Sequence, residues 1–442
     1  MITRNNLILF GFLILLLAIL LLTPRMIGTQ IEASVDDTMN SLLTDNLRSQ
    51  LQWQVVDYQR NWFSSTARYK IDYLPMGVDS GLSMELDLEI AHGPLHSSGD
   101  NWHLGLAGVT VKPVLDSKEI RKAIMDFPFP PPNPEIQLLV GFDESLEFRL
   151  TIAPSQFDNE EGSFRFDGLQ GQLITEADLS ARGTLDMGQL AATSANSNES
   201  FTVQGLQFTT ETAQINDLFA PSMAMIAIPA ISASGINGFS VEGISFSSAL
   251  DQSAGSDRRL NISQDIVIDS ITSELPVNSL SWQFELEQLP LDLLRSYQNL
   301  VNEARLQLAG NSASSNQFAE LGQQLGMQLL AADFAINSQL QADAYGASHQ
   351  ATLSIDYGGV ADVQNFSSMN PRSLLNAIEL TLQVDMDLEA ALRSPAAGMI
   401  DPYVQQGYIQ IDNGRIRLDA ELADSQLVLN GETIALDQWF AP

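Results

Sequence analysis

The chain contains no cysteine and only four lysines, and each of these two shortages excludes a kind of chemistry. Without cysteine there is no disulfide, thiol-redox or zinc–thiolate site, so the protein must hold together without covalent cross-links. All four lysines lie before residue 123, and 21 basic side chains stand against 54 acidic ones, for a net charge of −33. Binding nucleic acid requires Lys or Arg to neutralise phosphate, so we expect no nucleic-acid partner.

This acidic composition has two interpretations: a docking surface for a cation or a basic protein, or a solvated exterior. The charges are scattered along the chain rather than gathered in blocks, which favours the solvated exterior. The chain also has no Walker loop and no dinucleotide-binding fingerprint, and no G-x-S-x-G elbow surrounds Ser64 and Ser65. We therefore expect no cofactor and assign no catalytic residue.

The one long uncharged run, residues 7–22, predicts the compartment. At ~1.5 Å per residue it forms about 24 Å of helix, and its polar flanks complete a crossing of a bilayer core of about 30 Å. No small-residue cleavage site follows it, which favours an uncleaved anchor over a cleaved signal peptide. We therefore expect contact with the lipid bilayer through residues 7–22. Residues 1–27 then form a cytoplasmic stub and transmembrane anchor, and residues 28–442 lie on the far side of the membrane.

After the anchor, apolar residues recur every three or four positions from Ile27 to Leu43. This spacing predicts an amphipathic stalk helix, assigned to residues 28–57. The stripe packs either on the body of the same chain or on a second copy in a homodimer, and the spacing favours neither. Residues 58–442 form the body, with a sub-boundary near the proline-rich segment 127–134, which is typical of a rigid connector.

In the body the hydrophobic period changes to two. Residues 82–90 alternate between apolar and polar side chains, as do residues 148–152, 164–166, 282–286 and 380–388. Such strands have one buried and one solvated face, which is typical of antiparallel sheets. The pairs Asn413-Gly414 and Asn430-Gly431 predict two-residue hairpin turns.

Helical periodicity returns at residues 291–308 and 318–334, and Pro371 is well placed to open a short helix. We therefore expect an α+β fold that is mainly antiparallel β. It consists of an elongated, curved sheet with a few packed helices, including those of the 291–334 region on one face, plus the N-terminal transmembrane helix.

Three of the four histidines, His92, His96 and His103, lie within twelve positions. A metal site could use them, but a pair at four-residue spacing converges only on a helix, and Gly93-Pro94 interrupts any helix between His92 and His96. We therefore expect no metal site. Instead, His92 is expected to hydrogen-bond within the turn that it begins.

Two further groups have competing interpretations. Trp62 and Phe63 are predicted to form an aromatic plug that enters the first strand; the alternative is an aromatic platform for a ligand. Asp385, Asp387 and Glu389 occupy alternate positions of a predicted strand, where a solvated outer face is favoured over a calcium site or an acid/base pair.

Three local signatures resemble the YdgA-like family of bacterial envelope proteins, a domain of unknown function. They are residues 58–65, Tyr-Gln-Arg-Asn-Trp-Phe-Ser-Ser; residues 92–95, His-Gly-Pro-Leu; and residues 429–431, Leu-Asn-Gly. Asn61 stands where the family usually has glycine. The layout of anchor, helix and β-rich body matches over nearly the whole chain. The resemblance implies an inner-membrane-anchored protein facing the periplasm, and it implies no activity.

We therefore expect a non-catalytic binding or scaffolding role in the cell envelope, in which the apolar face of the sheet holds lipid acyl chains or a partner protein. The candidate ligand-binding residues are Trp62, Phe63 and His92. One alternative is an envelope hydrolase or metal-dependent enzyme that uses His92. Another is self-association through the stalk.

Overall fold

The computed structural model describes two compact units of the chain. Unit 1 comprises residues 1–190 and 207–220, and unit 2 comprises residues 191–206 and 221–442. The described residues are 51–73, 82–98, 101–114, 134–160, 162–197, 199–235, 238–253, 258–273, 277–308, 315–360 and 371–434, with Pro24 and Leu436.

Several predicted segments fall outside the described residues. They are the anchor at 7–22, residues 28–50 of the stalk, and the proline-rich segment up to Pro134, which begins a strand. In the described part of the chain, no helix is both long enough and apolar enough to cross a bilayer.

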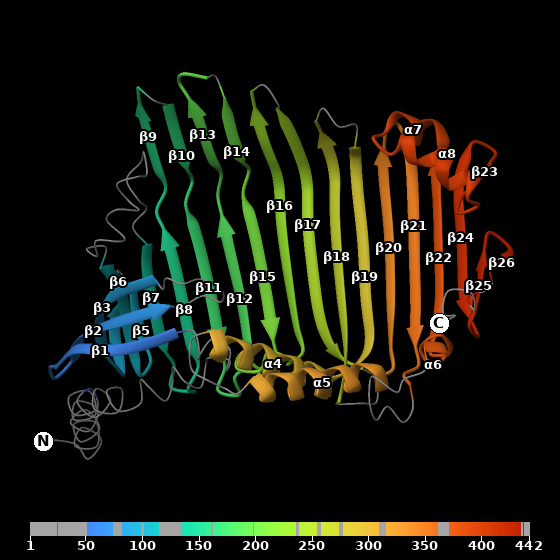
Figure 1. Ribbon diagram of the computed structural model, residues 1–442. Helices are drawn as coiled ribbons and strands as arrows, with labels where there is room; N and C mark the ends of the chain where they lie inside the picture. Colours follow the sequence, from blue (N-terminus) through green and yellow to red (C-terminus); the bar gives the residue numbers. More distant parts are fainter. Residues whose placement is uncertain are drawn as a thin grey trace, which may run out of the picture. The chain divides into compact units, whose positions relative to one another are not determined.

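Unit 1 contains a series of antiparallel strands in the spatial order β1-β2-β3-β6-β7-β8-β11-β12-β15, with β4 and β5 forming a separate hairpin (Figure 1). The strands are β1 (Leu51–Arg60), β2 (Ser64–Tyr73), β3 (Leu82–His92), β4 (Leu95–Ser98), β5 (Asn101–Leu104), β6 (Ala107–Val114), β7 (Pro134–Val140), β8 (Leu146–Ile152), β9 (Ser155–Asn159), β10 (Gly162–Phe166), β11 (Leu169–Thr175), β12 (Ala181–Met187) and β15 (Leu206–Thr212).

Strand β1 corrects one prediction. Residues 51–57, assigned to the stalk helix, belong to this strand, which pairs with β2 from Leu51 opposite Tyr73 to Arg60 opposite Ser65. The reason lies in the local pattern: Leu51, Trp53 and Val55 alternate with glutamines, and the β-branched pair at 55–56 favours a strand.

The core of unit 1 forms on one face of β2, β3 and β6. Ala67, Tyr69, Ile90 and Val109 are at most 7% exposed. Ala67 lies opposite Leu88, and Ile90 lies opposite Val109, so the strand register brings these apolar side chains into contact.

Unit 2 contains longer antiparallel strands, ordered β14-β16-β17-β18-β19-β20-β21-β22-β24-β25-β26, and five helices among its described residues (Figure 1). Its elements are β13 (Leu190–Ser194), β14 (Ser200–Val203), β16 (Ser222–Ser234), β17 (Phe239–Gln252), β18 (Arg259–Thr272), β19 (Val277–Pro290), α4 (Leu291–Leu308), α5 (Ser315–Ala331), β20 (Phe334–Ala344), β21 (Ala347–Tyr357), α6 (Pro371–Asn376), β22 (Ile378–Asp387), α7 (Leu388–Arg393), α8 (Ala397–Gln405), β23 (Gln410–Asp412), β24 (Arg415–Ala423), β25 (Gln426–Leu429) and β26 (Glu432–Ile434).

The hairpin signals and the two long helix signals of unit 2 are confirmed. Asn413 and Gly414 have φ angles of 49° and 76°, and Asn430 and Gly431 have φ angles of 51° and 84°, so both pairs form the predicted hairpin turns. The two predicted helices are α4 and α5, although α5 ends at Ala331 because the next strand begins at Phe334.

Candidate functional site

The first candidate, His92, lies at the end of β3 and is hydrogen-bonded to Ser65 on the neighbouring strand β2. The distance between His92 Nε2 and Ser65 Oγ is 2.9 Å, and the two residues are 3% and 0% exposed. The prediction that His92 bonds within its own turn is therefore wrong. The two residues are 27 positions apart and meet because Ser65 lies opposite Ile90, near the end of β3.

This pair has the composition of a nucleophile and its base, but its geometry is that of a buried structural contact. A nucleophilic serine must be reachable by substrate, and the base is normally oriented by a third group on its other nitrogen. Ser65 has no exposed surface, and His92 Nδ1 has no hydrogen-bond partner among the described residues. The arrangement therefore fixes β2 to β3.

Burial sets the charge state of His92. Desolvation lowers the pKa of its imidazole below the usual value, because the charged form loses its hydration. Smaller contributions come from the Trp62 backbone, which raises the pKa, from the charge of Arg60, which lowers it, and from the Pro24 backbone, which raises it. His92 is thus neutral at pH 7, and Pro24 lies beside its ring.

The other two histidines form a second pair. His96 on β4 lies opposite His103 on β5, with ring centroids 6.1 Å apart. His96 is 4% exposed, and neither of its ring nitrogens has a hydrogen-bond partner among the described residues. Burial, and then the proximity of His103, lower its pKa. Within the described ranges, no three His, Asp or Glu side chains are grouped to hold a metal ion.

These histidines predict a loss of stability in acid. The pKa values of His92 and His96 are lowered in the folded state, so below the unfolded value of about 6.5 the unfolded chain binds more protons. Their contribution is complete above pH 6.5 and is lost as the pH falls through the folded pKa values. We expect unit 1 to be less stable at pH 5.5 than at pH 7.5, by at most about 1.4 kcal/mol per histidine per pH unit.

Hydrogen exchange of the β3–β6 peptides at the two pH values, corrected for intrinsic exchange rates, measures this difference. His96→Leu removes a buried imidazole that has no hydrogen-bond partner among the described residues. We expect it to reduce the stability difference between the two pH values, and we attribute the remaining difference to His92. An equal difference in wild type and His96→Leu would show that His96 does not contribute.

Trp62 and Phe63 do not form the predicted plug. They lie in the turn between β1 and β2, which closes with a hydrogen bond from Asn61 N–H to Ser64 O (2.8 Å). Their exposed fractions are 42% and 53%. The turn extends beyond the end of the strands, so these rings lie outside the core of unit 1 instead of filling it.

The three carboxylates of the predicted acidic strand face do not all lie on one strand. Asp385 lies on β22 and pairs with Arg415 at 2.5 Å. Asp387 ends the strand and caps α7, accepting from Ala390 N–H at 2.8 Å, and Glu389 lies inside that helix. The expected strand face ends at Asp387 because its carboxylate caps a helix there.

The largest candidate site is the apolar face of unit 2. A row of directly opposed residues crosses β17, β18, β19, β20, β21, β22 and β24, and every member is apolar. Residues opposed in this way lie on one face of a sheet. The row consists of Phe246, Ile266, Trp282, Leu340, Ala351, Val384 and Leu418.

The adjacent row, one residue along each strand, has the opposite character and lies on the opposite face. It contains two carboxylates, amides and hydroxyls: Ser247, Asp265, Gln283, Gln339, Thr352, Gln383 and Asp419. The alternation therefore continues without a change of phase over seven strands. At ~4.8 Å between strands, the apolar row is about 29 Å long.

Among the described residues, helices pack on this apolar face in two places (Figure 1): α4 and α5 near the strand ends that carry Leu289, and α8 near Ile416. At one end, Leu293 of α4 and Ala332 pack with Leu289 and are 5–7% exposed. At the other end, Ile400 of α8 packs on Ile416, which is fully buried. Between these ends the side chains are partly exposed, and Leu340 reaches 40%. We call the middle part, which none of the described helices covers, the apolar floor.

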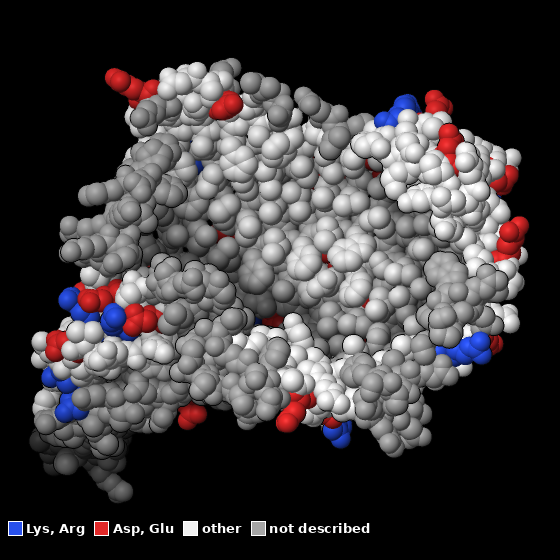
Figure 2. All heavy atoms as spheres, in the orientation of Figure 1, with Lys and Arg blue, Asp and Glu red and all other residues white. Residues whose placement is uncertain are grey.

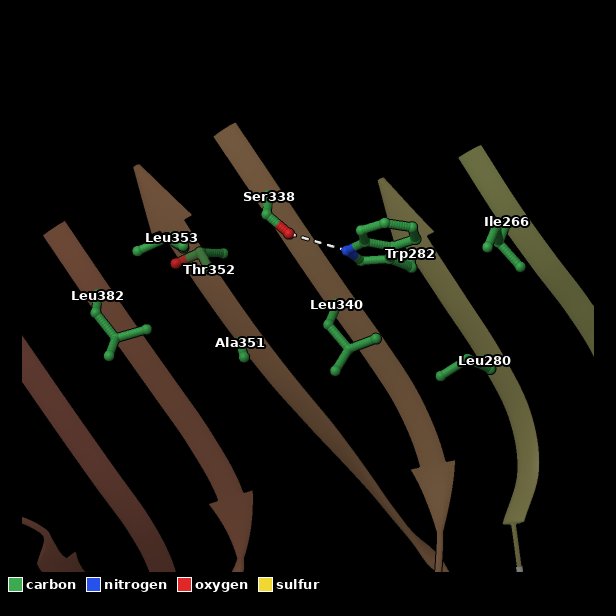
Figure 3. A pocket seen from close by; sticks show the side chains of 9 residues that line it. All are labelled: Ile266, Leu280, Trp282, Ser338, Leu340, Ala351, Thr352, Leu353 and Leu382. Carbon is green, nitrogen blue, oxygen red and sulfur yellow. Dashed lines mark hydrogen bonds between the residues drawn. The ribbon is translucent and has the colours of Figure 1, made fainter. Parts of the chain in front are cut away.

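The apolar floor is hollowed. It contains a cavity of about 450 Å³, within the usual range of ligand sites, and Figure 2 shows it as a mostly uncharged depression. The apolar side chains that line it are Ile266, Leu280, Trp282, Leu340, Ala351, Leu353 and Leu382 (Figure 3).

Few polar groups line the floor, and their residues are Ser338 and Thr352. Trp282 Nε1–H donates to Ser338 Oγ at 2.9 Å, across the strand pair β19–β20 (Figure 3). The backbone groups of the floor form the sheet ladders. The site therefore offers shape and apolar surface, and hardly any hydrogen-bonding capacity. Sequence alternation indicated the apolar face, but nothing in the sequence showed that its middle is left uncovered.

These features define an antiparallel β protein with a shallow, open apolar site. The chain belongs to the DUF945 family of bacterial proteins of unknown function, whose family model matches residues 6–437. The resemblance to the YdgA-like family is thereby confirmed. No curated protein and no solved structure matches the chain.

Proposed function

We propose that the protein is a membrane-anchored, non-catalytic binding protein of the bacterial envelope that holds lipid acyl chains on its apolar floor. Residues 7–22 form a single-pass anchor in the inner membrane, and the body faces the periplasm. The observation that carries the proposal is the uninterrupted apolar row across seven strands, which the described helices leave uncovered between their contacts near Leu289 and Ile416.

The chemistry of the floor favours an acyl chain over a peptide. An extended peptide brings N–H and C=O groups that lose water and need new partners. The floor offers few, because its backbone is bonded in the sheet and only two residues with hydroxyl groups, Ser338 and Thr352, line the hollow. An acyl chain needs no hydrogen bond and gains about 0.8 kcal/mol for each methylene that it buries.

The dimensions also agree. A bilayer core of about 30 Å holds two layers of acyl chains, so one chain spans about 15 Å. The apolar row, at roughly 29 Å, is longer than this. A protein partner on the same face is the runner-up. A hydrolase based on His92 is less well supported, because Ser65 is closed to solvent.

Photolabelling tests the proposal directly. A fatty acid that carries a diazirine near its methyl end is equilibrated with the full-length protein and irradiated, and the modified peptides are mapped by mass spectrometry. We expect labels on β18 to β22, at residues such as Trp282, Leu340 and Leu353, which face the hollow. Labels confined to residues 7–22, or spread equally over both faces of the sheet, would contradict it.

A further inference from the structure

We propose that one end of the unit 1 sheet docks on the bilayer surface through an apolar rim. Three segments follow one another there: the β1–β2 turn, the β4–β5 hairpin and the β7–β8 turn. Backbone hydrogen bonds at this end run from His92 N–H, at the end of β3, to Phe63 O in the β1–β2 turn (2.9 Å), and from Leu106 N–H, just after β5, to Val140 O at the end of β7 (2.8 Å). The rim consists of six large apolar side chains that are 42% to 76% exposed: Trp62, Phe63, Leu95, Trp102, Leu104 and Phe142.

The β4–β5 hairpin shows how the rim is built. Its cross-strand pairs put His96 and His103 on one face, and Leu95 and Leu104 on the other, together with Trp102. The histidine face packs on the sheet: a Cβ at Gly108 of β6 would lie 2.5 Å from Cδ2 of His96. The hairpin therefore presents its apolar face to solvent, with Trp102 71% and Leu104 76% exposed.

The composition of the rim fits a bilayer interface. Tryptophan is enriched where membrane meets water, because its ring is apolar and its N–H is polar. Exposed apolar surfaces of this kind mark interaction sites on soluble bodies. Loop side chains reach only a few ångströms beyond a sheet, and interfacial elements insert by about 5–10 Å, into the headgroup region.

The position of Pro24 also indicates that the rim faces the bilayer. Its backbone is near enough to the ring of His92 to raise the pKa of that ring, and His92 lies at the end of β3 that carries the rim. Pro24 follows residues 7–22 with a single residue between them. The chain therefore leaves the proposed anchor next to the rim, so an anchored protein would bring the rim to the bilayer. This orientation rests on the proposed anchor.

The charges of the rim limit how deeply it inserts into the bilayer, and they determine which headgroup charge it favours. Asp143 and Glu144 are exposed in the β7–β8 turn beside Phe142. The Asp143 carboxylate accepts from Ser145 Oγ at 2.6 Å and from Ser145 N–H at 3.2 Å, which lowers its pKa and keeps it charged. A charged carboxylate at this point stops the loop at the headgroups, and it favours a zwitterionic surface over an anionic one.

Site-specific quenching tests the rim in the full-length protein. Because the chain has no cysteine, Leu104→Cys carries a single environment-sensitive fluorophore. The protein is reconstituted into phosphatidylcholine vesicles with nitroxide groups on the upper acyl chain. The matched control is Tyr73→Cys. Tyr73 is 36% exposed and lies at the opposite end of β2. We expect at least threefold stronger quenching at position 104 than at position 73.

Equal quenching at the two positions in membrane-bound protein would overturn the rim. A second result would also overturn it. If the fluorophore at position 104 becomes shielded as the protein concentration rises in the absence of lipid, the rim contacts a second copy of the chain. A failure of the proposed anchor can be distinguished from a failure of the rim, because a carbonate wash would then remove the protein from the vesicles. Circular dichroism of both variants checks that the exposed substitutions leave the fold intact.

Discussion

Leu340→Glu is expected to reduce acyl-chain binding at least tenfold, whereas Gln341→Glu leaves it nearly unchanged. The two substitutions introduce the same charge at adjacent positions of β20, but the side chains point to opposite faces of the sheet. Leu340 lies in the apolar row, between Trp282 and Ala351, and lines the hollow. Gln341 lies on the polar face, opposite Ser281 and Gln350.

The physical reason is desolvation. An acyl chain laid over Leu340 shields this position from water, and a carboxylate there would have to lose its hydration without gaining a partner. Leu340 is 40% exposed in the free protein, so the glutamate stays solvated until a ligand arrives and costs the fold little. The loss therefore appears in binding rather than in folding.

Titration with a fluorescent fatty acid, in protein freed of bound lipid, measures the effect. Gln341→Glu controls for the added charge, which is small beside a net charge of −33. If both variants bind as the wild type does, the apolar floor is not the site. If both lose binding equally, the effect arises from charge repulsion and not from the floor.

The sequence predicted local structure well because local patterns decide it. Alternation at residues 82–90 and 282–286 gives β3 and β19, and the positive φ angles that Asn-Gly pairs favour give both C-terminal hairpins. The failure at residues 51–57 arose where the apolar spacing of a predicted helix was extended into a segment that alternates. The helical spacing and the strand alternation overlap in this segment, and its pairing with β2 makes it a strand.

The candidate sites depended on information that is not local. Ser65 and His92 meet through the register of β2 and β3, for which a 27-residue separation gives no signal. Trp62 and Phe63 have the composition of a core, but they lie in a turn beyond the strand ends. Likewise, alternation shows which face of unit 2 is apolar, whereas only the positions of the helices show where that face is left open.

This difference between covered ends and open middle predicts two unequal costs for the same substitution. Leu260→Ala is expected to destabilise unit 2 by about 2–5 kcal/mol, and Leu340→Ala by about 1 kcal/mol or less. Leu260 on β18 is 1% exposed and lies opposite Leu289, in the covered end, so its removal leaves a cavity that water and neighbouring atoms do not fill. Leu340 already contacts solvent, so its removal enlarges an open hollow and adds no cavity cost.

Hydrogen exchange of the β18–β20 peptides measures both costs in the same strands, since β18 carries Leu260 and β20 carries Leu340. Lipid must first be removed, because a bound acyl chain would bury Leu340 and raise the cost of losing it. Repeating the measurement with fatty acid present then gives the sharper result: the cost of Leu340→Ala should rise while that of Leu260→Ala stays constant. Equal costs without ligand would mean that the middle of the face is covered in solution, and the floor could then not admit a chain.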